Sequence, residues 1–97
     1  MVLKKPAQAG TLESSDVRIT AEPNPGNGIV IRIESPVKAL FGEAIEETVR
    51  QVLKEFDVEE AKIDVFDRGA LDFAIRARTE CVLCRAAEVP FQWGKED

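Results

Sequence analysis

The segment SPVKALFGEAIEETVRQVLKEF, residues 35–56, decides the fold class of this chain. Ser35 is a residue type that caps helix N-termini, and Pro36 suits the first helical position. Apolar residues then recur at intervals of three and four: Val37, Leu40, Phe41, Ala44, Ile45, Val49, Val52, Leu53 and Phe56. This spacing predicts one amphipathic helix of about five turns. Its opposite face is acidic, with Glu43, Glu46, Glu47 and Glu55.

Two segments with strand periodicity precede this helix, at residues 16–20 and 29–34. Apolar residues alternate with polar ones in the first, and three isoleucines alternate with outward residues in the second. Residues 22–28, EPNPGNG, form a dense turn signal between them. The pattern predicts a β-hairpin with a long loop.

Two more alternating segments follow the helix, at residues 61–65 and 71–78, with turn chemistry at Asp67-Arg68-Gly69 between them. They predict a second pair of strands. Thr79 is expected to cap a last helix that ends at Pro90. Phe91 and Trp93 are expected to fold back onto an apolar edge.

The predicted fold class is α+β: a two-layer ββαββα sandwich, in which a four-stranded, mainly antiparallel sheet carries the helices on one face. Residues 1–13 lack periodicity and are predicted to be a flexible N-terminal arm. Residues 14–97 are predicted to form a single domain, which fits the length of 97 residues.

Composition excludes several functions. Histidine is absent, which removes the usual general base and the commonest metal ligand, so a self-sufficient enzyme is not expected. The net charge of −5 argues against nucleic-acid binding. No apolar run approaches the roughly 20 residues that cross a bilayer, and the N-terminus lacks the apolar region of a signal peptide. A cytoplasmic protein is expected.

Cys81 and Cys84 form a C-x-x-C pair near the end of the chain. A structural zinc site usually has four ligands, and a redox C-x-x-C usually follows a strand in a βαβ unit. We therefore expect two small residues on one face of a short helix, and no metal site.

Four arginines, Arg18, Arg32, Arg76 and Arg78, fall at outward positions of the predicted strands. An arginine-rich sheet face would suit phosphate groups, because arginine binds them through two parallel hydrogen bonds. Acidic residues are interleaved with these arginines, which favours a solvated face with cross-strand ion pairs instead.

The segment AGTLESSD, residues 9–16, places two serine hydroxyls beside acidic residues ahead of the first predicted strand. Ser14 and Ser15 have no base nearby, so neither is a good nucleophile on its own. As modification acceptors they would need only exposure. From the residues alone, a Ser/Asp-rich entry to a strand is the simpler interpretation.

Five stretches of the chain carry a family resemblance: AGTLESSDVRI at 9–19, I-x-I-x-I-E-S at 29–35, V-K-x-x-F-G-x-x-I at 37–45, D-x-G-A-L-D at 67–72 and R-A-R at 76–78. On these, the chain resembles the acyl carrier proteins of citrate lyase, the gamma chains of that complex, over nearly its whole length. The N-terminal block is long and specific.

The resemblance implies that Ser14 carries a phosphoribosyl-dephospho-CoA group through a phosphodiester, with Ser15 as the less favoured position. It implies a non-catalytic carrier of acetyl and citryl thioesters during cleavage of citrate to acetate and oxaloacetate. The implied partners are the alpha (acyltransferase) and beta (acyl lyase) subunits and a prosthetic-group transferase, with neither nucleic acid nor membrane among them.

Three alternatives stay open. The chain would equally suit the carrier of a citramalate lyase-type complex. It could also be an unmodified acidic protein-interaction domain that uses the glutamate-rich helix face. A small redox or metal protein based on Cys81 and Cys84 is the third.

Overall fold

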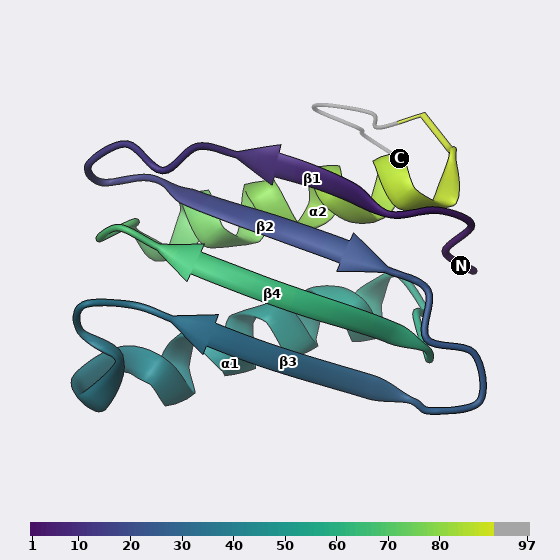
Figure 1. The fold of residues 1–97 in the computed structure, drawn as a ribbon, viewed down its shortest axis with the longest axis horizontal. Helices are drawn as coiled ribbons and strands as arrows, with labels where there is room; N and C mark the ends of the chain where they lie inside the picture. Colours follow the sequence, from purple (N-terminus) through teal and green to yellow (C-terminus); the bar gives the residue numbers. More distant parts are fainter. Residues whose placement is uncertain (91–97) are drawn as a thin grey trace.

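A four-stranded sheet of order β1-β2-β4-β3 forms one layer of the computed structural model, which describes residues 1–90 (Figure 1). The strands are β1 (Ala7–Gly10), β2 (Val17–Glu22), β3 (Ile29–Glu34) and β4 (Ala61–Asp67). The pairs β1–β2 and β2–β4 are antiparallel, and the pair β3–β4 is parallel.

Two helices form the second layer, and both lie behind the sheet in Figure 1. They are α1 (Lys38–Glu55) and α2 (Asp72–Ala87). Helix α2 packs against β1 and β2, while α1 packs against β3 and α2. The predicted α+β class, with a mainly antiparallel four-stranded sheet covered on one face, is confirmed. Within residues 1–90, neither helix is long and apolar enough to span a membrane.

The core lies between the layers and is organised by β4, the longer of the two central strands. Its residues alternate strictly between buried and half-buried positions. Ile63 and Val65 point from β4 into the core beside Ile19 of β2, and the helices cover them with side chains such as Val49 and Leu83. This alternation sets the register, because a slip of one residue would turn every apolar side chain to solvent.

The predicted hairpin between residues 16–20 and 29–34 is wrong, because β4 lies between β2 and β3. Residues 29–34 instead pair with β4 in parallel, Ile31 opposite Ile63. Parallel neighbours need a long crossover, which α1 provides. The turn-rich segment 23–28 therefore connects two strands that are not paired with each other.

The strand predicted over residues 71–78 is also wrong, because these residues form the first half of α2. Two of the apolar residues that suggested a strand, Leu71 and Phe73, are exposed on the surface. The buried residues of the helix recur instead at helical spacing: Ile75, Thr79, Val82, Leu83, Cys84, Ala86 and Ala87. Thr79 is consequently not a cap; its hydroxyl donates to the Ile75 carbonyl one turn earlier, at 2.7 Å.

The remaining strand of the sheet, β1, lies within residues 1–13, where the sequence predicts a flexible arm. Ala7–Gly10 pairs with β2, and Leu3 is buried in the core. The amide of Lys4 donates to the Ala86 carbonyl at 2.8 Å, which fixes the chain before β1. The arm is thus corrected to an edge strand, and its short, small-residue sequence hides the strand pattern.

Helix α1 begins at Lys38, so Ser35 and Pro36 lie before the helix and not at its predicted start. The Ser35 hydroxyl instead accepts a hydrogen bond from the Val37 amide at 3.1 Å. The expected packing of Phe91 and Trp93 concerns residues outside the described part of the chain.

Gly10 gives the first test of this fold. Its φ is +91°, and a Cβ there would lie 1.8 Å from the backbone oxygen of Val17. We expect Gly10→Ala to lower the free energy of unfolding by about 2–3 kcal/mol, from backbone strain plus displacement of β1 from β2. Urea unfolding followed by circular dichroism measures it.

Gly26→Ala is the matched control. Gly26 also has a positive φ, +77°, but a Cβ there meets nothing within 4 Å. It should cost only the conformational penalty of about 1 kcal/mol. Equal losses in both variants would show that the close approach of Gly10 to β2 is unimportant.

Candidate functional site

The turn between β1 and β2, residues 11–16, carries both serines that the sequence indicates. Ser14 and Ser15 are exposed at its tip. In Figure 1 this turn lies at the left end of the sheet, where β4 also ends and α1 begins. The sequence therefore predicted the exposure of Ser14 correctly, although a tight turn replaces the extended arm.

Backbone hydrogen bonds fasten the β1–β2 turn to the loop after β4. The Ser15 amide donates to the Arg68 carbonyl at 2.8 Å, and the Arg68 amide donates to the Asp16 carbonyl at 2.9 Å. Ser15 adopts a left-handed conformation, φ 65°, to make this approach. The backbone of Ser15 is thus held against the body, while Ser14, next to it, faces solvent.

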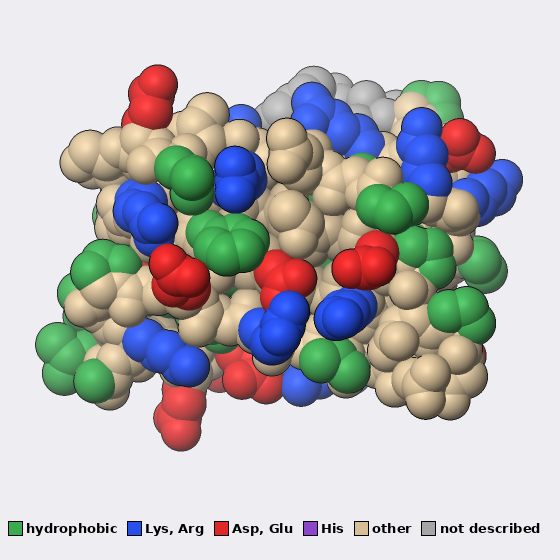
Figure 2. All heavy atoms as spheres, in the orientation of Figure 1, with side chains coloured by type: hydrophobic (Ala, Val, Ile, Leu, Met, Phe, Trp, Pro, Cys, Tyr) green, Lys and Arg blue, Asp and Glu red, His purple; other side chains and the backbone are tan. Residues whose placement is uncertain are grey.

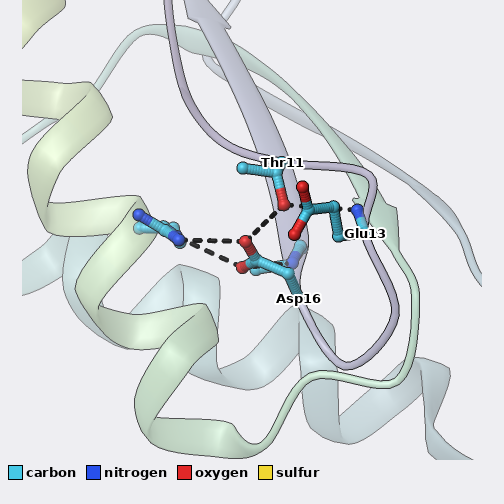
Figure 3. Close-up of polar contacts among 5 residues, drawn as sticks. Thr11, Glu13 and Asp16 are labelled. Atoms are coloured by element: carbon cyan, nitrogen blue, oxygen red, sulfur yellow. Dashed lines mark hydrogen bonds and ion pairs between the residues drawn. The ribbon is translucent and has the colours of Figure 1, made fainter.

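Asp16 is the polar centre of the turn (Figure 3). Its carboxylate accepts the Thr11 hydroxyl at 2.6 Å and the Val17 amide at 2.7 Å. From α2, the Arg78 guanidinium donates to both carboxylate oxygens, at 2.9 and 3.3 Å. Thr11 in turn accepts the Glu13 amide at 3.2 Å, so one carboxylate orders both arms of the turn.

These contacts lower the pKa of Asp16 from 3.8 to about 2, the Thr11 hydrogen bond acting most strongly and Arg78 adding to it against the effect of burial. So weak a base is a poor acceptor for the proton of a neighbouring serine. The histidine-free sequence offers no imidazole for this role either. Neither Asp16 nor a histidine therefore activates the Ser14 hydroxyl as a nucleophile.

A buried carboxylate, Asp67, shapes the loop that holds the turn. Asp67, at the end of β4, is 1% exposed. It accepts the Ser35 hydroxyl at 2.7 Å and the amides of Gly69 and Ala70 at 3.1 and 2.9 Å. The Asp67 side chain thereby connects the start of α1 to the loop between β4 and α2, and fixes Arg68 where it meets the β1–β2 turn.

The four arginines do not share one face. Arg18 and Arg32 lie on the open face of the sheet, where Figure 2 shows basic and acidic side chains interleaved. Arg32 pairs with Asp64 directly across the strands, at 2.9 Å. Arg76 and Arg78 lie on α2, where Arg76 pairs with Glu55 of α1. The arginine-rich face is thus excluded, and the interleaved ion pairs are confirmed for Arg32.

Both cysteines lie on α2, Cys81 half-buried and Cys84 buried, and both are free thiols. Burial, and secondarily the neighbouring Cys81 and Glu80, raise the pKa of the Cys84 thiol, which disfavours the reactive thiolate. The expectation that they share a helix is confirmed. Within residues 1–90, no group of three or more potential ligand side chains could hold a metal ion.

Sequence reasoning missed Thr11, Arg68 and Arg78 as parts of this site. Thr11 and Asp16 are five residues apart in one turn, so a local hydrogen bond was within reach of the sequence. The role of Arg68 depends on the pairing of β2 with β4, and that of Arg78 depends on the packing of α2 beside β2. No local pattern signals either contact. Arg78 in particular belongs to a segment with strand-like alternation.

Comparison with known proteins defines the class first. Residues 4–86 match the model of an acyl carrier family described as malonate decarboxylase delta subunit (MdcD). The matched region contains the whole sheet, the β1–β2 turn and nearly all of α2. The chain therefore belongs to an acyl carrier family.

The relatives identify the branch of this family. A citrate lyase acyl carrier protein of Fusobacterium nucleatum is 56% identical over 91% of this chain and 94% of its own length. Those of Lactococcus lactis and Clostridium perfringens are 52% and 44% identical over 91% and 97% of this chain, and 91% and 94% of their own. The chain belongs to the family of citrate lyase acyl carrier proteins, as the sequence resemblance indicated.

A solved structure gives the fold alone. A crystal structure of a protein from Thermus thermophilus superposes with a TM-score of 0.62 at 20% identity. The match covers 87% of this chain but only 16% of that one. The same two-layer arrangement therefore occurs as a small part of a larger protein.

The charge on Asp16 gives a test that pH controls. A carboxyl whose pKa is lowered in the folded state stabilises it fully above the ordinary value of 3.8, and that contribution is lost as the pH falls through about 2. We expect Asp16→Asn to lower the free energy of unfolding by about 1 kcal/mol at pH 7, through weaker bonds to Thr11 and Arg78.

Urea unfolding of both proteins at pH 7, 4, 3 and 2 measures the difference, which should shrink below pH 4. Glu43→Gln, at an exposed position of α1, is the control and should change little at any pH. A difference between wild type and Asp16→Asn that stays constant from pH 7 to pH 2 would contradict the assignment.

Proposed function

We propose that this chain is the acyl carrier subunit of a citrate lyase, with a CoA-derived prosthetic group attached to Ser14. The group expected from the resemblance is phosphoribosyl-dephospho-CoA, joined through a phosphodiester to the serine oxygen. The observation that carries the proposal is the exposure of Ser14 on a turn whose backbone is fixed by Ser15, Asp16 and Arg68.

The residues around Ser14 fit an acceptor role. Its hydroxyl is accessible to a modifying enzyme, which must supply the base that takes the proton, because Asp16 is a very weak base. From α2, the Arg78 guanidinium pairs with Asp16, two residues after Ser14, which places a cation in contact with the turn that would carry the phosphodiester. Ser15 fits less well, since its backbone is held in a left-handed turn.

When bound, such a group supplies a terminal thiol that holds an acyl residue as a thioester. The chain itself supplies a fixed point of attachment. Tethering turns encounters between the acyl group and two active sites into intramolecular ones at high effective concentration. The proposed partners are therefore an acyltransferase subunit and a lyase subunit, and the proposed reaction is cleavage of citrate to acetate and oxaloacetate in the cytoplasm.

A citramalate lyase-type complex would use the same carrier chemistry, and nothing in the turn distinguishes the two acids. An unmodified interaction domain is supported by a different feature. Glu43, Glu46 and Glu47 line a shallow region of α1 together with Arg50. Because Arg50 already pairs with Glu46 at 2.9 Å, this face is less strongly acidic than its sequence suggests.

Site-directed variants test the attachment. We expect wild-type protein, co-expressed with its modifying enzymes, to gain the mass of the CoA-derived group on Ser14. Ser14→Ala should lose loading completely, because the accepting oxygen is gone. Intact mass spectrometry with peptide mapping measures both.

Ser15→Gly is the matched variant. Glycine accepts the positive φ of Ser15 and keeps the amide that donates to Arg68, so this protein should still be loaded. Loading that survives Ser14→Ala but fails in Ser15→Gly would move the attachment to Ser15. A wild-type chain that stays unmodified would overturn the carrier proposal and favour the interaction domain.

A further inference from the structure

An apolar groove lies beside the β1–β2 turn, on the helix side of the sheet. It has a volume of about 450 Å³, within the usual range of small-molecule sites. Residues of α1, of the β4–α2 loop and of α2 line it: Val37, Phe41, Ala44, Ile45, Asp67, Gly69, Ala70, Leu71, Asp72 and Ile75. Phe41 and Leu71 remain 54% and 66% exposed there, which is unusual for large apolar side chains that face one hollow.

The β4–α2 loop that lines this groove also holds the turn that carries Ser14. Arg68, whose backbone bonds the turn at Ser15 and Asp16, lies directly between Asp67 and Gly69, both of which line the groove. A chain attached at Ser14 therefore starts next to the residues whose backbone is bonded to the loop that lines the groove.

We infer that the groove is a resting site for the pantetheine part of the arm carried by Ser14. This inference rests on the attachment proposed above. The charge pattern supports it: Arg78 pairs with Asp16 in the turn that carries Ser14, and the groove lined by the neighbouring β4–α2 loop is apolar, as the uncharged pantetheine requires. Pantetheine alternates methyl and methylene groups with two amides, so it needs a mostly apolar wall with a few hydrogen-bond acceptors.

A hydrogen-bond acceptor is present at the start of α2, the Asp72 carboxylate. The Asp72 carboxylate accepts the Thr48 hydroxyl on one oxygen, and it has further acceptor capacity on the other. Asp67, by contrast, already accepts three hydrogen bonds from Ser35, Gly69 and Ala70 and shapes the wall. Asp72 is thus the side chain placed to receive a pantetheine amide.

The open face of the sheet is the competing location. It offers Arg18, whose guanidinium lies 5.4 Å from the centre of the Phe66 ring, and the ion pair of Arg32 with Asp64. Only scattered apolar side chains interrupt this charged surface (Figure 2). It suits a neutral, methyl-rich arm less well than the groove does.

Free pantetheine provides a test that does not depend on loading. Titrated to tens of millimolar into the unmodified full chain, it should shift the methyl resonances of Val37, Ala44, Ile45 and Ile75 in carbon–proton correlation spectra. In the loaded protein the same methyls should differ from the unmodified protein without added ligand. Absence of shifts at these methyls in both experiments would overturn the inference, as would shifts centred on Arg18 and Phe66.

Ala44→Phe should fill the groove and weaken pantetheine binding about tenfold. Ala39→Phe is the control: Ala39 is also exposed on α1 but does not line the groove, so its affinity should match wild type. Equal affinities in both variants would contradict the resting site.

The two proposals fail separately. If mass spectrometry finds Ser14 unmodified but pantetheine still shifts the groove methyls, the groove binds its ligand and the carrier function is wrong. If Ser14 is loaded and the groove methyls do not respond, the carrier function stands and the resting site is wrong.

Discussion

The paired backbone hydrogen bonds that join Arg68 to Ser15 and Asp16 extend the β2–β4 ladder beyond the ends of the strands. The position of the β1–β2 turn relative to the β4–α2 loop depends on these bonds. They hold the β1–β2 turn against the loop that also lines the apolar groove, and they leave the Ser14 side chain exposed. Because β4 is central, with neighbours on both sides, the turn is anchored to a strongly buried strand of the sheet.

Two carboxylates then hold the turn and the loop that the β2–β4 ladder brings together. Asp16 and Asp67 each collect several donors, and each joins elements that are distant in the sequence: Asp16 connects the turn to α2 through Arg78, and Asp67 connects β4 to the start of α1 through Ser35. Charge-assisted hydrogen bonds of this kind are stronger than neutral ones and more demanding in geometry. Both carboxylates therefore have structural roles in the part of the molecule that carries Ser14.

The sequence predicted the parts of the fold whose periodicity matches their burial. Helix α1 buries one stripe that includes Ile45, Val49 and Val52, so its pattern was unambiguous. The strand prediction for residues 71–78 was wrong because Leu71 and Phe73 are apolar yet exposed. Leu71 lies at the edge of the groove, and Phe73 lies on α2. The pairing of β3 with β4 could not be read locally either, since it depends on α1 crossing between them. Ser14 was found through the family pattern, whereas its anchors Arg68 and Arg78 required the packed structure.

Two exposed apolar residues, Phe41 and Leu71, line the groove, and the proposed resting site gives a physical reason for their exposure. Burying Phe41 and Leu71 in the domain would gain about 25 cal/mol for each Å² of apolar surface, so leaving them exposed lowers the stability of the isolated chain. That loss is offset if a ligand or partner covers them during function. A carrier must hold its cargo weakly enough to release it to other proteins, and a shallow, half-open groove beside a fixed attachment point provides weak binding raised by tethering. The exposure of Leu71, which contributed to the wrong strand prediction, is thus a feature that the proposed reversible resting site uses.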